Sequence, residues 1–295
     1  MKKEITDLNI SISEIGIKLK KYCFIVILGF FSLGTFANPR LATKEQIGMF
    51  KNSKTCIVLD NVNITYNMLI KDAIQKYWKS TEYEFIDQPE FEKRRSNSKY
   101  SFLVVMKEVF DKDPAGVSYN FINLVLGGPA DDMTNMPELC SIPLSYYNDN
   151  NLNYGYAIPA IVKFMQIHVK NLERRHFFIS LKGLKFYNWF ENYNDKVLIL
   201  NQNMMASNAN TVEKIKPIYS NKFKILTTSE IEKELSTSPV NTLFNFHVGP
   251  TQNTGVGKCF EMIFDVEGNL YYYKYRMITN VNTDGFNLKD FSRIR

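Results

Sequence analysis

The residues that most often carry chemistry are scarce in this chain of 295 residues, which contains three histidines and four cysteines. It has no His–Glu pair at helical spacing, no Gly-x-Ser-x-Gly turn and no cysteine pairs at zinc-ribbon spacing. These absences exclude the common metalloprotease, α/β-hydrolase and zinc-ribbon patterns. We therefore expect neither a catalytic or metal-binding motif nor a cofactor.

A phosphate-binding loop is also missing, although residues 249–258 end on Gly257-Lys258 as such a loop would. Gln252 stands where the first glycine is needed, and Cys259 stands where Ser or Thr should follow the lysine. The next residues are typical of a strand, so no helix N-terminus would be there to hold a phosphate. A hairpin connection is the favoured interpretation.

Strong charge of one sign is missing as well, since the formal net charge is +6. Nucleic-acid binding requires a denser basic stripe than this chain has. The best local candidate, residues 170–176, is more typical of a solvated helix end. We therefore expect no nucleic-acid partner.

Three cysteines follow residue 37, namely Cys56, Cys140 and Cys259. An odd number permits at most one internal bridge, and Cys140 with Cys259 is one possibility. Cys56 lies in an apolar run and is expected to be buried. Cys140 beside a histidine would be a conceivable catalytic pair.

What the chain does have is an export signal at its start. Lys18, Lys20 and Lys21 precede an uncharged run over residues 22–38, which ends on small residues around Ala37. This order predicts a cleaved secretory signal over residues 1–37; the alternative is a membrane anchor that is kept. The run lacks a cysteine at the cleavage point, so a lipid anchor is not expected. The remaining chain would carry a net charge of +4 and no transmembrane span.

An internal repeat follows the signal. Residues 55–60 and 196–201 are short apolar runs that read as strands buried on both faces. Each precedes a helical pattern, over residues 63–78 and 208–219, and Pro217 should kink or shorten the second. Alternating strands follow in both copies.

The closest match between the copies is a helix start. Residues 87–93 align without a gap on residues 227–233. Asp87 and Thr227 suit helix N-caps, and a glutamate lies three residues after each, as a capping box requires. Duplication of one unit explains this order and spacing better than two unrelated units do.

Further strands are predicted in both copies, and a helix lies between the copies. The strand runs are residues 100–106, 117–125, 242–248, 259–265 and 270–278. Residues 158–172 carry an apolar stripe at helical spacing, with Lys163, Gln166 and Lys170 on the other side. This pattern predicts an amphipathic helix packed on a sheet.

The sequence thus predicts a mixed α/β fold of two tandem related modules. Each has strand–helix–strand–helix order followed by a β meander, with helices packed on mixed sheets. The expected segments are a signal peptide (1–37), a linker (38–54), a first module (55–175), a connector (176–194) and a second module (195–295).

This order resembles the α/β modules of the TolB amino-terminal domain and of the curli-secretion CsgG family. The passage over residues 83–93 and its counterpart at 223–233 carry the resemblance. It implies an envelope protein with mixed α/β modules. The lipid-anchoring cysteine of the curli-type family and the propeller that follows the TolB module are missing, so no functional residue is transferred.

Export, duplication and the missing catalytic set predict a non-enzymatic envelope protein of the periplasm, outer envelope or cell surface. Another envelope protein or self-assembly would supply its partner. The alternative is a small-molecule or glycan binder with its site between the modules, and an exported hydrolase is a third option. Shared concave loops would favour ligand binding, and a long apolar strand edge would favour assembly.

Candidate contact residues follow from the rule that open α/β sheets bind ligands at the carboxyl ends of their strands. Asp60 and Asn61 come after the first strand, and Asn201 and Gln202 come after its counterpart. Asp131 and Asp132 form a further polar loop. These six residues are the predicted ligand or partner loops.

Overall fold

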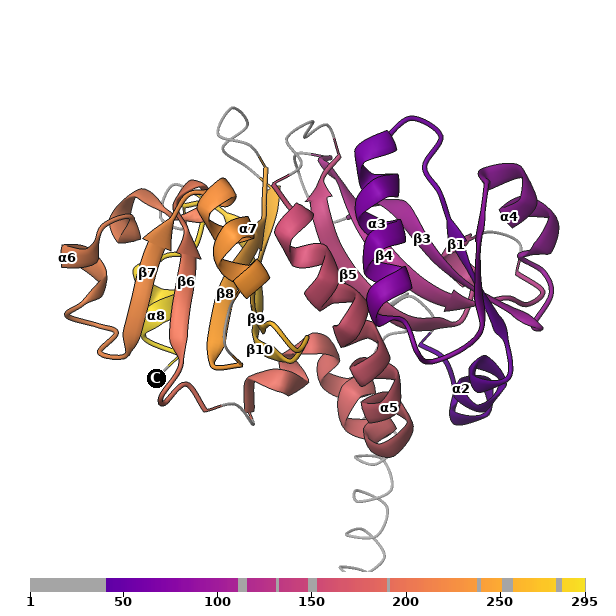
Figure 1. The fold of residues 1–295 in the computed structure, drawn as a ribbon. Helices are drawn as coiled ribbons and strands as arrows, with labels where there is room; N and C mark the ends of the chain where they lie inside the picture. Colours follow the sequence, from indigo (N-terminus) through magenta and orange to yellow (C-terminus); the bar gives the residue numbers. More distant parts are fainter. Residues whose placement is uncertain are drawn as a thin grey trace, which may run out of the picture. The chain divides into compact units, whose positions relative to one another are not determined.

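The computed structural model describes residues 41–110, 116–130, 133–147, 153–189, 192–237, 240–250, 257–279 and 283–294. The predicted signal peptide lies outside the described residues. Residues 39–295 form one compact unit. Figure 1 shows the helices and strands of this unit. All of the buried cores described below belong to it.

The first module contains one five-stranded sheet, here called sheet 1, in the order β2-β1-β3-β4-β5. Strands β2, β1 and β3 are parallel, and β4 and β5 continue antiparallel. Its elements are α2 (Lys44–Lys51), β1 (Lys54–Val58), α3 (Ile64–Tyr77), β2 (Tyr83–Ile86), α4 (Gln88–Arg94), β3 (Tyr100–Val109), β4 (Ser118–Leu126), η1 (Met133–Asn135) and β5 (Glu138–Tyr146).

The second module repeats that arrangement in a sheet here called sheet 2, in the order β7-β6-β8-β9-β10. Strands β7, β6 and β8 are parallel, and β9 and β10 are antiparallel additions. Its elements are β6 (Val197–Asn201), η4 (Gln202–Met204), η5 (Ser207–Ala209), α6 (Val212–Ile215), β7 (Lys222–Leu226), α7 (Thr228–Thr237), β8 (Thr242–Val248), β9 (Gly257–Asp265), β10 (Leu270–Ile278) and α8 (Leu288–Phe291). The expected mixed α/β class with two tandem modules is confirmed.

The helices after the first strand of each module differ in length, as the sequence predicted. Helix α3 has 14 residues, while α6 has four and ends just before Pro217. A proline ring cannot continue the helical hydrogen bonds, so this helix stops after one turn. The second copy therefore covers that face of its sheet with less helix than the first copy does.

The two matched helix starts are confirmed as caps, with one difference. Asp87 accepts a hydrogen bond from the Glu90 N–H, but the Glu90 side chain pairs with Arg94 instead of closing a capping box. At α7 the box is closed: the Thr227 N–H donates to Glu230 Oε2 at 2.8 Å. The two helices therefore have N-caps at the same position, but the glutamate three residues later forms different hydrogen bonds in each.

Helix α5 (Ile158–Lys182) joins the modules and packs against both. It continues ten residues past the predicted end, with a non-helical break at Arg175. Gln166, expected to face away, is buried: its Nε2 donates to the Tyr77 carbonyl at 2.9 Å, and its Oε1 accepts from the Lys79 N–H at 2.7 Å. The helix is buried on more than one side because it serves two modules.

The modules bury opposite faces of their sheets against α5. Sheet 1 contributes the face covered by α3, represented by Ile57 and Leu103, to the core that contains α5. Sheet 2 contributes the face covered by α7, represented by Ile199 and Phe244. The other faces have separate cores, one under α4 and one under α6 and α8.

Aromatic rings reinforce the junction beyond α5. Phe260 of β9 packs its ring edge-on against Tyr119 and Phe121 of β4, with ring centres 5.5 Å apart in each case. The Tyr119 hydroxyl donates to the Lys258 carbonyl at 2.6 Å. The junction thus combines ring packing with a hydrogen bond to the backbone.

Two expectations need correction, and one open question is answered. Residues 38–54 were expected to be a linker, but α2 lies there and buries Ile47 and Phe50 against the first core. The connector expected over residues 176–194 consists largely of the end of α5 and of η3 (Gly183–Trp189). The possible bridge between Cys140 and Cys259 is not formed, since both thiols are free and buried, as is Cys56.

Among the described residues, none of the helices combines the length and the apolar character needed to cross a bilayer.

Candidate functional site

A cavity of about 830 Å³ opens at the carboxyl ends of β6 and β8. The second module contributes the η4–η5 segment, the end of β8 and residues 283–285, and the first module contributes the end of β5 with Asn153 and Tyr154. The cavity is therefore shared by both modules. It lies where open α/β sheets usually bind ligands.

The described lining residues combine neutral polar side chains with apolar ones. Amide and hydroxyl groups come from Asn153, Gln202, Asn203, Ser207 and Asn210. Apolar surface comes from Tyr146, Tyr154, Met204, Phe246 and Val248. Among the described lining residues, the charged side chains are His247 and Asp284.

Asn201 supports the part of the cavity wall that η4 forms. Its backbone N–H donates to Asn245 Oδ1 at 2.7 Å, and its side chain accepts from the Asn203 N–H at 3.0 Å and donates to Thr228 Oγ1 at 3.1 Å. Asn201 is fully buried. It therefore shapes the loop and is not available to touch a ligand.

The wall formed by residues 283–285 is fixed against that loop by the backbone. The Phe286 N–H donates to the Met204 carbonyl at 2.8 Å, and the Ala206 N–H donates to the Phe286 carbonyl at 3.0 Å. Gly285 has φ +86°, and a Cβ there would lie 2.6 Å from the Ala206 nitrogen. The close approach of the two segments thus requires glycine.

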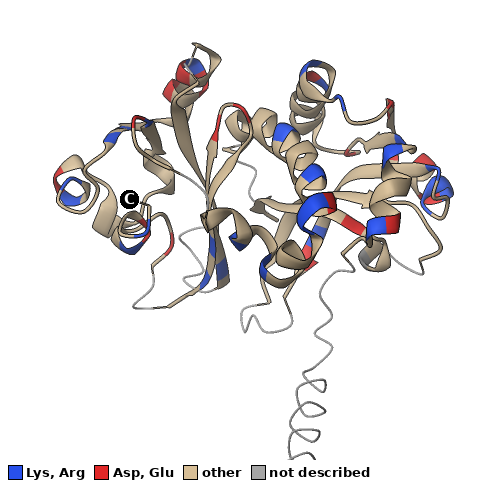
Figure 2. Cartoon of the chain, turned by 90° about the horizontal axis from the view of Figure 1, so that it is seen from below, with Lys and Arg blue, Asp and Glu red and all other residues tan. Residues whose placement is uncertain are grey.

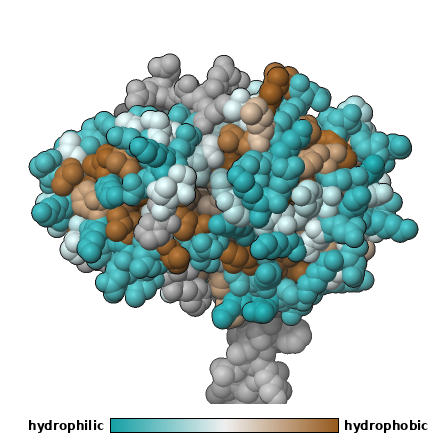
Figure 3. All heavy atoms as spheres, viewed as in Figure 1, coloured by the Kyte–Doolittle hydropathy of each residue, from teal (hydrophilic) through white to brown (hydrophobic). Residues whose placement is uncertain are grey.

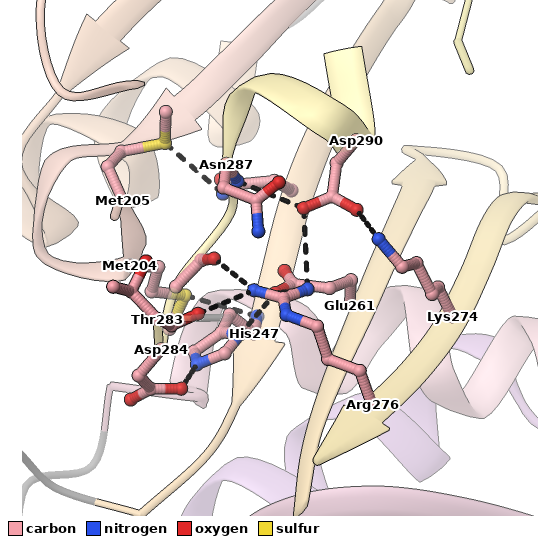
Figure 4. Close-up of polar contacts among 12 residues, drawn as sticks. Met204, Met205, His247, Glu261, Lys274, Arg276, Thr283, Asp284, Asn287 and Asp290 are labelled. Carbon is pink, nitrogen blue, oxygen red and sulfur yellow. Dashed lines mark hydrogen bonds and ion pairs between the residues drawn. The ribbon is translucent and has the colours of Figure 1, made fainter. Parts of the chain in front are cut away.

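His247 lies at the edge of the cavity between two carboxylates. Its Nε2 donates to Asp284 Oδ1 at 2.7 Å, and its Nδ1 lies 3.2 Å from Glu261 Oε1 (Figure 4). The Glu261 side chain is fully buried, and that of His247 is 8% exposed. Both ring nitrogens therefore face carboxylate oxygens in surroundings with little water.

Behind His247 the charges continue toward the C-terminal helix α8. Arg276 Nη1 lies 2.9 Å from Glu261 Oε1 and 3.4 Å from Asp290 Oδ2, and Lys274 pairs with the other oxygen of Asp290. Arg276 Nη2 also donates to the Gly285 carbonyl at 2.6 Å. We call the six residues the charge network: His247, Glu261, Lys274, Arg276, Asp284 and Asp290.

The pairing of His247 with Asp284 favours the charged form of each. Burial alone would lower the pKa of His247, but Glu261 and Asp284 together raise it to about 10. Burial would raise the pKa of Asp284, and His247 holds it below its usual value. With its pKa raised in this way, His247 is an imidazolium at neutral pH, and an imidazolium cannot accept a proton as a general base.

The conceivable pair of Cys140 with a histidine is not poised for catalysis. Burial, with Glu138 nearby, raises the pKa of the Cys140 thiol well above its usual value. His168 Nδ1 lies 2.9 Å from the Tyr187 hydroxyl, and burial lowers the pKa of His168 to about 4. A buried thiol with a raised pKa is a poor nucleophile because it remains protonated.

The predicted contact residues separate into three groups. Gln202 lines the cavity and its neighbour Asn201 supports it. Asp60 is not a lining residue: its Oδ1 accepts from the backbone N–H groups of Val62 and Asn63, each at 2.7 Å, and so shapes the turn before α3, while Asn61 is exposed. Asp131 and Asp132 lie outside the described residues.

Sequence reasoning missed His247, Glu261, Arg276 and Asp284. A signal was present, because each of the first three lies within a strand rich in apolar and aromatic residues. A charged residue within a strand that reads as buried must find a partner. Which partner it finds depends on the pairing of the strands.

No group of three or more His, Cys, Asp or Glu side chains among the described residues is arranged to hold a metal ion. No protein-family model, no curated protein and no solved structure matches this chain.

Proposed function

We propose that this chain is an exported, non-enzymatic binding protein of the cell envelope that holds a small neutral polar ligand between its two modules. The observation that carries the proposal is the cavity of about 830 Å³, whose walls come from strand ends of both modules. Ligand sites usually have volumes of about 300–1,000 Å³.

The lining favours an uncharged ligand with several hydroxyl or amide groups, such as a saccharide. Amide and hydroxyl side chains can both donate and accept hydrogen bonds. The partly exposed ring of Tyr146 suits the apolar face of a sugar ring. Because His247 and Asp284 neutralise each other, the described wall offers no net charge for an ionic ligand.

Assembly through sheet edges has less support. The outer strands β2 and β7 have four and five residues, and β7 carries Lys222 and Lys224. The backbone of β10 is engaged at Tyr273, which exchanges two hydrogen bonds with the Asn188 side chain. Short, charged or covered edges resist strand addition.

The visible surface agrees with this preference. On the face shown in Figure 3, hydrophilic residues predominate and apolar residues form separate patches. A large contiguous apolar patch on the surface of a soluble protein usually marks an interaction site. This face therefore favours a ligand-binding role over broad protein assembly.

A binding screen with a blocking variant tests the proposal. We expect neutral saccharides from a panel of envelope sugars, peptides and lipids to raise the melting temperature of the protein. Ser207→Trp places a large ring in the cavity from an exposed lining position and should abolish that shift. Asn208→Trp is the matched control, since Asn208 is the next residue in η5, is exposed and does not line the cavity.

A shift that persists in Ser207→Trp would show that binding occurs elsewhere, and equal loss in both variants would show that the substitutions disturb η5 instead of blocking the cavity. A screen in which no neutral compound stabilises the protein would overturn the proposal. A turnover activity that survives Ser207→Trp would also contradict it.

A further inference from the structure

The last turns of α5 present large apolar side chains to solvent. Beyond the break at Arg175, Phe177 is 70% exposed, Phe178 is 49% exposed and Leu181 is 66% exposed. These positions are three to four residues apart or adjacent, so they share one side of the helix end. Trp189 at the end of η3 is also exposed. We call Phe177, Phe178, Leu181 and Trp189 the α5 tip.

The α5 tip is anchored and is not a frayed helix end. Ile179, between the exposed residues, is buried in the main core. His176 Nε2 lies 2.9 Å from the Ala42 carbonyl oxygen, and Gly183, with φ +55°, ends the helix. An anchored element that exposes this much apolar surface invites a partner.

Basic residues flank the tip along the chain. Residues 170–185 contain Lys170, Arg174, Arg175, Lys182 and Lys185 against one acid, Glu173. Glu173 is paired with Lys51 at 2.6 Å. The Lys182 ammonium lies 5.2 Å from the centre of the Trp189 ring. Figure 2 views the molecule from below, with its basic positions in blue.

The described chain begins beside this tip, because Ala42 contacts His176. This contact, at 2.9 Å, ties the first described residues to the helix end that carries the tip.

From these observations we infer that the α5 tip lies against the surface of an anionic phospholipid bilayer. Aromatic and aliphatic side chains enter the headgroup boundary, while surrounding lysines and arginines attract acidic headgroups. A second copy of the chain would bring another basic surface to this basic patch, which electrostatic repulsion opposes. The inference does not depend on the ligand proposed for the cavity.

The test uses the protein starting at Pro39, which contains the complete compact unit and lacks the leader. It is mixed with vesicles of about 30% phosphatidylglycerol in phosphatidylcholine, or with phosphatidylcholine alone, and sedimented. We expect binding to the anionic vesicles that falls when salt is raised from about 0.05 to about 0.5 M.

Tryptophan fluorescence gives a second readout. The two tryptophans are Trp78, which is buried, and Trp189, which is exposed. Emission should therefore shift to the blue on binding through Trp189. Trp189→Phe should keep binding and lose the shift.

Variants separate the apolar and the charged contributions. Phe177→Ser with Phe178→Ser should weaken vesicle binding at least about tenfold, because two apolar side chains no longer enter the boundary. Arg174→Glu with Lys182→Glu should remove the preference for anionic vesicles. Ile64→Ser with Met68→Ser is the matched control, because these α3 residues are 72% and 67% exposed and lie away from the tip.

No sedimentation with anionic vesicles, or equal loss in the α3 control, would overturn the inference. Equal binding to neutral vesicles would overturn the electrostatic part of it. A dimer that forms without lipid and is abolished by the Phe177→Ser, Phe178→Ser variant would assign the tip to a second copy instead.

Discussion

Val105, Ile122 and Ile142 lie side by side across β3, β4 and β5 of sheet 1. In sheet 2, the corresponding strands are β8, β9 and β10. The residues side by side on the matching face of these strands are His247, Glu261 and Lys274. The two sheets thus share strand order and directions, while one row is apolar and the other is charged. A backbone topology does not dictate the chemistry of its faces.

The covering elements explain the difference. The row of sheet 1 lies in the core that contains α3 and α5, where a charge would be deprived of water. The row of sheet 2 lies under residues 283–294, a short segment that supplies Asp284 and Asp290 as partners. The charge network therefore holds residues 283–294 against sheet 2, and the start of this segment forms one wall of the cavity.

Removing one partner from the charge network should destabilise the second module more than any of the substitutions that follow. In Arg276→Met, Glu261 and Asp290 remain buried without their shared cation, and we expect the free energy of unfolding to fall by about 3–5 kcal/mol. Urea denaturation measures this change. Ile122→Val in sheet 1 should cost only about 1 kcal/mol.

Lys289→Met is the control, because Lys289 is an exposed cation on α8. It should change stability by less than about 0.5 kcal/mol. If Arg276→Met and Lys289→Met were equally mild, the network would contribute nothing to stability.

Two histidines should make stability depend on pH in opposite directions. The pKa of His247 is raised from 6.5 to about 10, so its contribution is complete below pH 6.5 and is lost as pH rises toward 10. The pKa of His168 is lowered to about 4, so its contribution is present above 6.5 and is lost as pH falls through 4. A tenfold change in the proton affinity of a group between the unfolded and folded protein corresponds to about 1.4 kcal/mol.

Urea denaturation across this pH range should show His247→Gln losing the alkaline slope and keeping the acid slope. His168→Gln should do the reverse in part, since Asp284, whose pKa is lowered, also contributes on the acid side. An unchanged alkaline slope in His247→Gln would contradict the charged state assigned to this residue.

Glycine-to-alanine substitutions should have opposite signs in the two modules. Gly285→Ala forces a side chain into positive φ against the Ala206 backbone and should cost about 1–2 kcal/mol while narrowing the cavity. Gly48→Ala, in an open position of helix α2, should gain about 0.5–1 kcal/mol. Thermal unfolding of both variants checks the signs, and a stabilising Gly285→Ala would refute the strain argument.

The smallest effects should come from the matched caps. Asp87→Ala and Thr227→Ala should each cost about 1 kcal/mol. Glu230→Gln should preserve most of its capping box, since an amide oxygen can still accept the Thr227 N–H. Glu90→Gln should instead weaken the pair with Arg94. If Glu230→Gln and Glu90→Gln changed stability equally, the two caps would not differ in the way proposed.

Most strands and the tandem order of the modules were predictable, because a buried strand is a short run of apolar residues in the sequence. Strand β5 was harder to see, since Ser141, Pro143 and Ser145 interrupt its run. Helix α5 was cut short because the charged residues before His176 look like a helix end. The capping-box residues Thr43 and Gln46 signalled α2, but the helix has only eight residues.

The site was predictable only where it follows from position along a strand. Gln202 follows the end of β6, so the strand-end rule found it. His247 and Asp284 are 37 residues apart and meet because β8, β9 and β10 pair in one register before the chain returns. A local sequence pattern cannot predict such a long-range contact.

The opposite faces that the sheets present to α5 also define the symmetry of the pair. Two units that met through the same face would form an isologous twofold pair, whereas unequal faces make a heterologous contact. Repeated between separate chains, a heterologous contact adds units into open-ended filaments unless a rotation closes the ring. Here α4 covers the remaining face of sheet 1, and α6 and α8 cover that of sheet 2. These helices act as end caps that limit the series to two units.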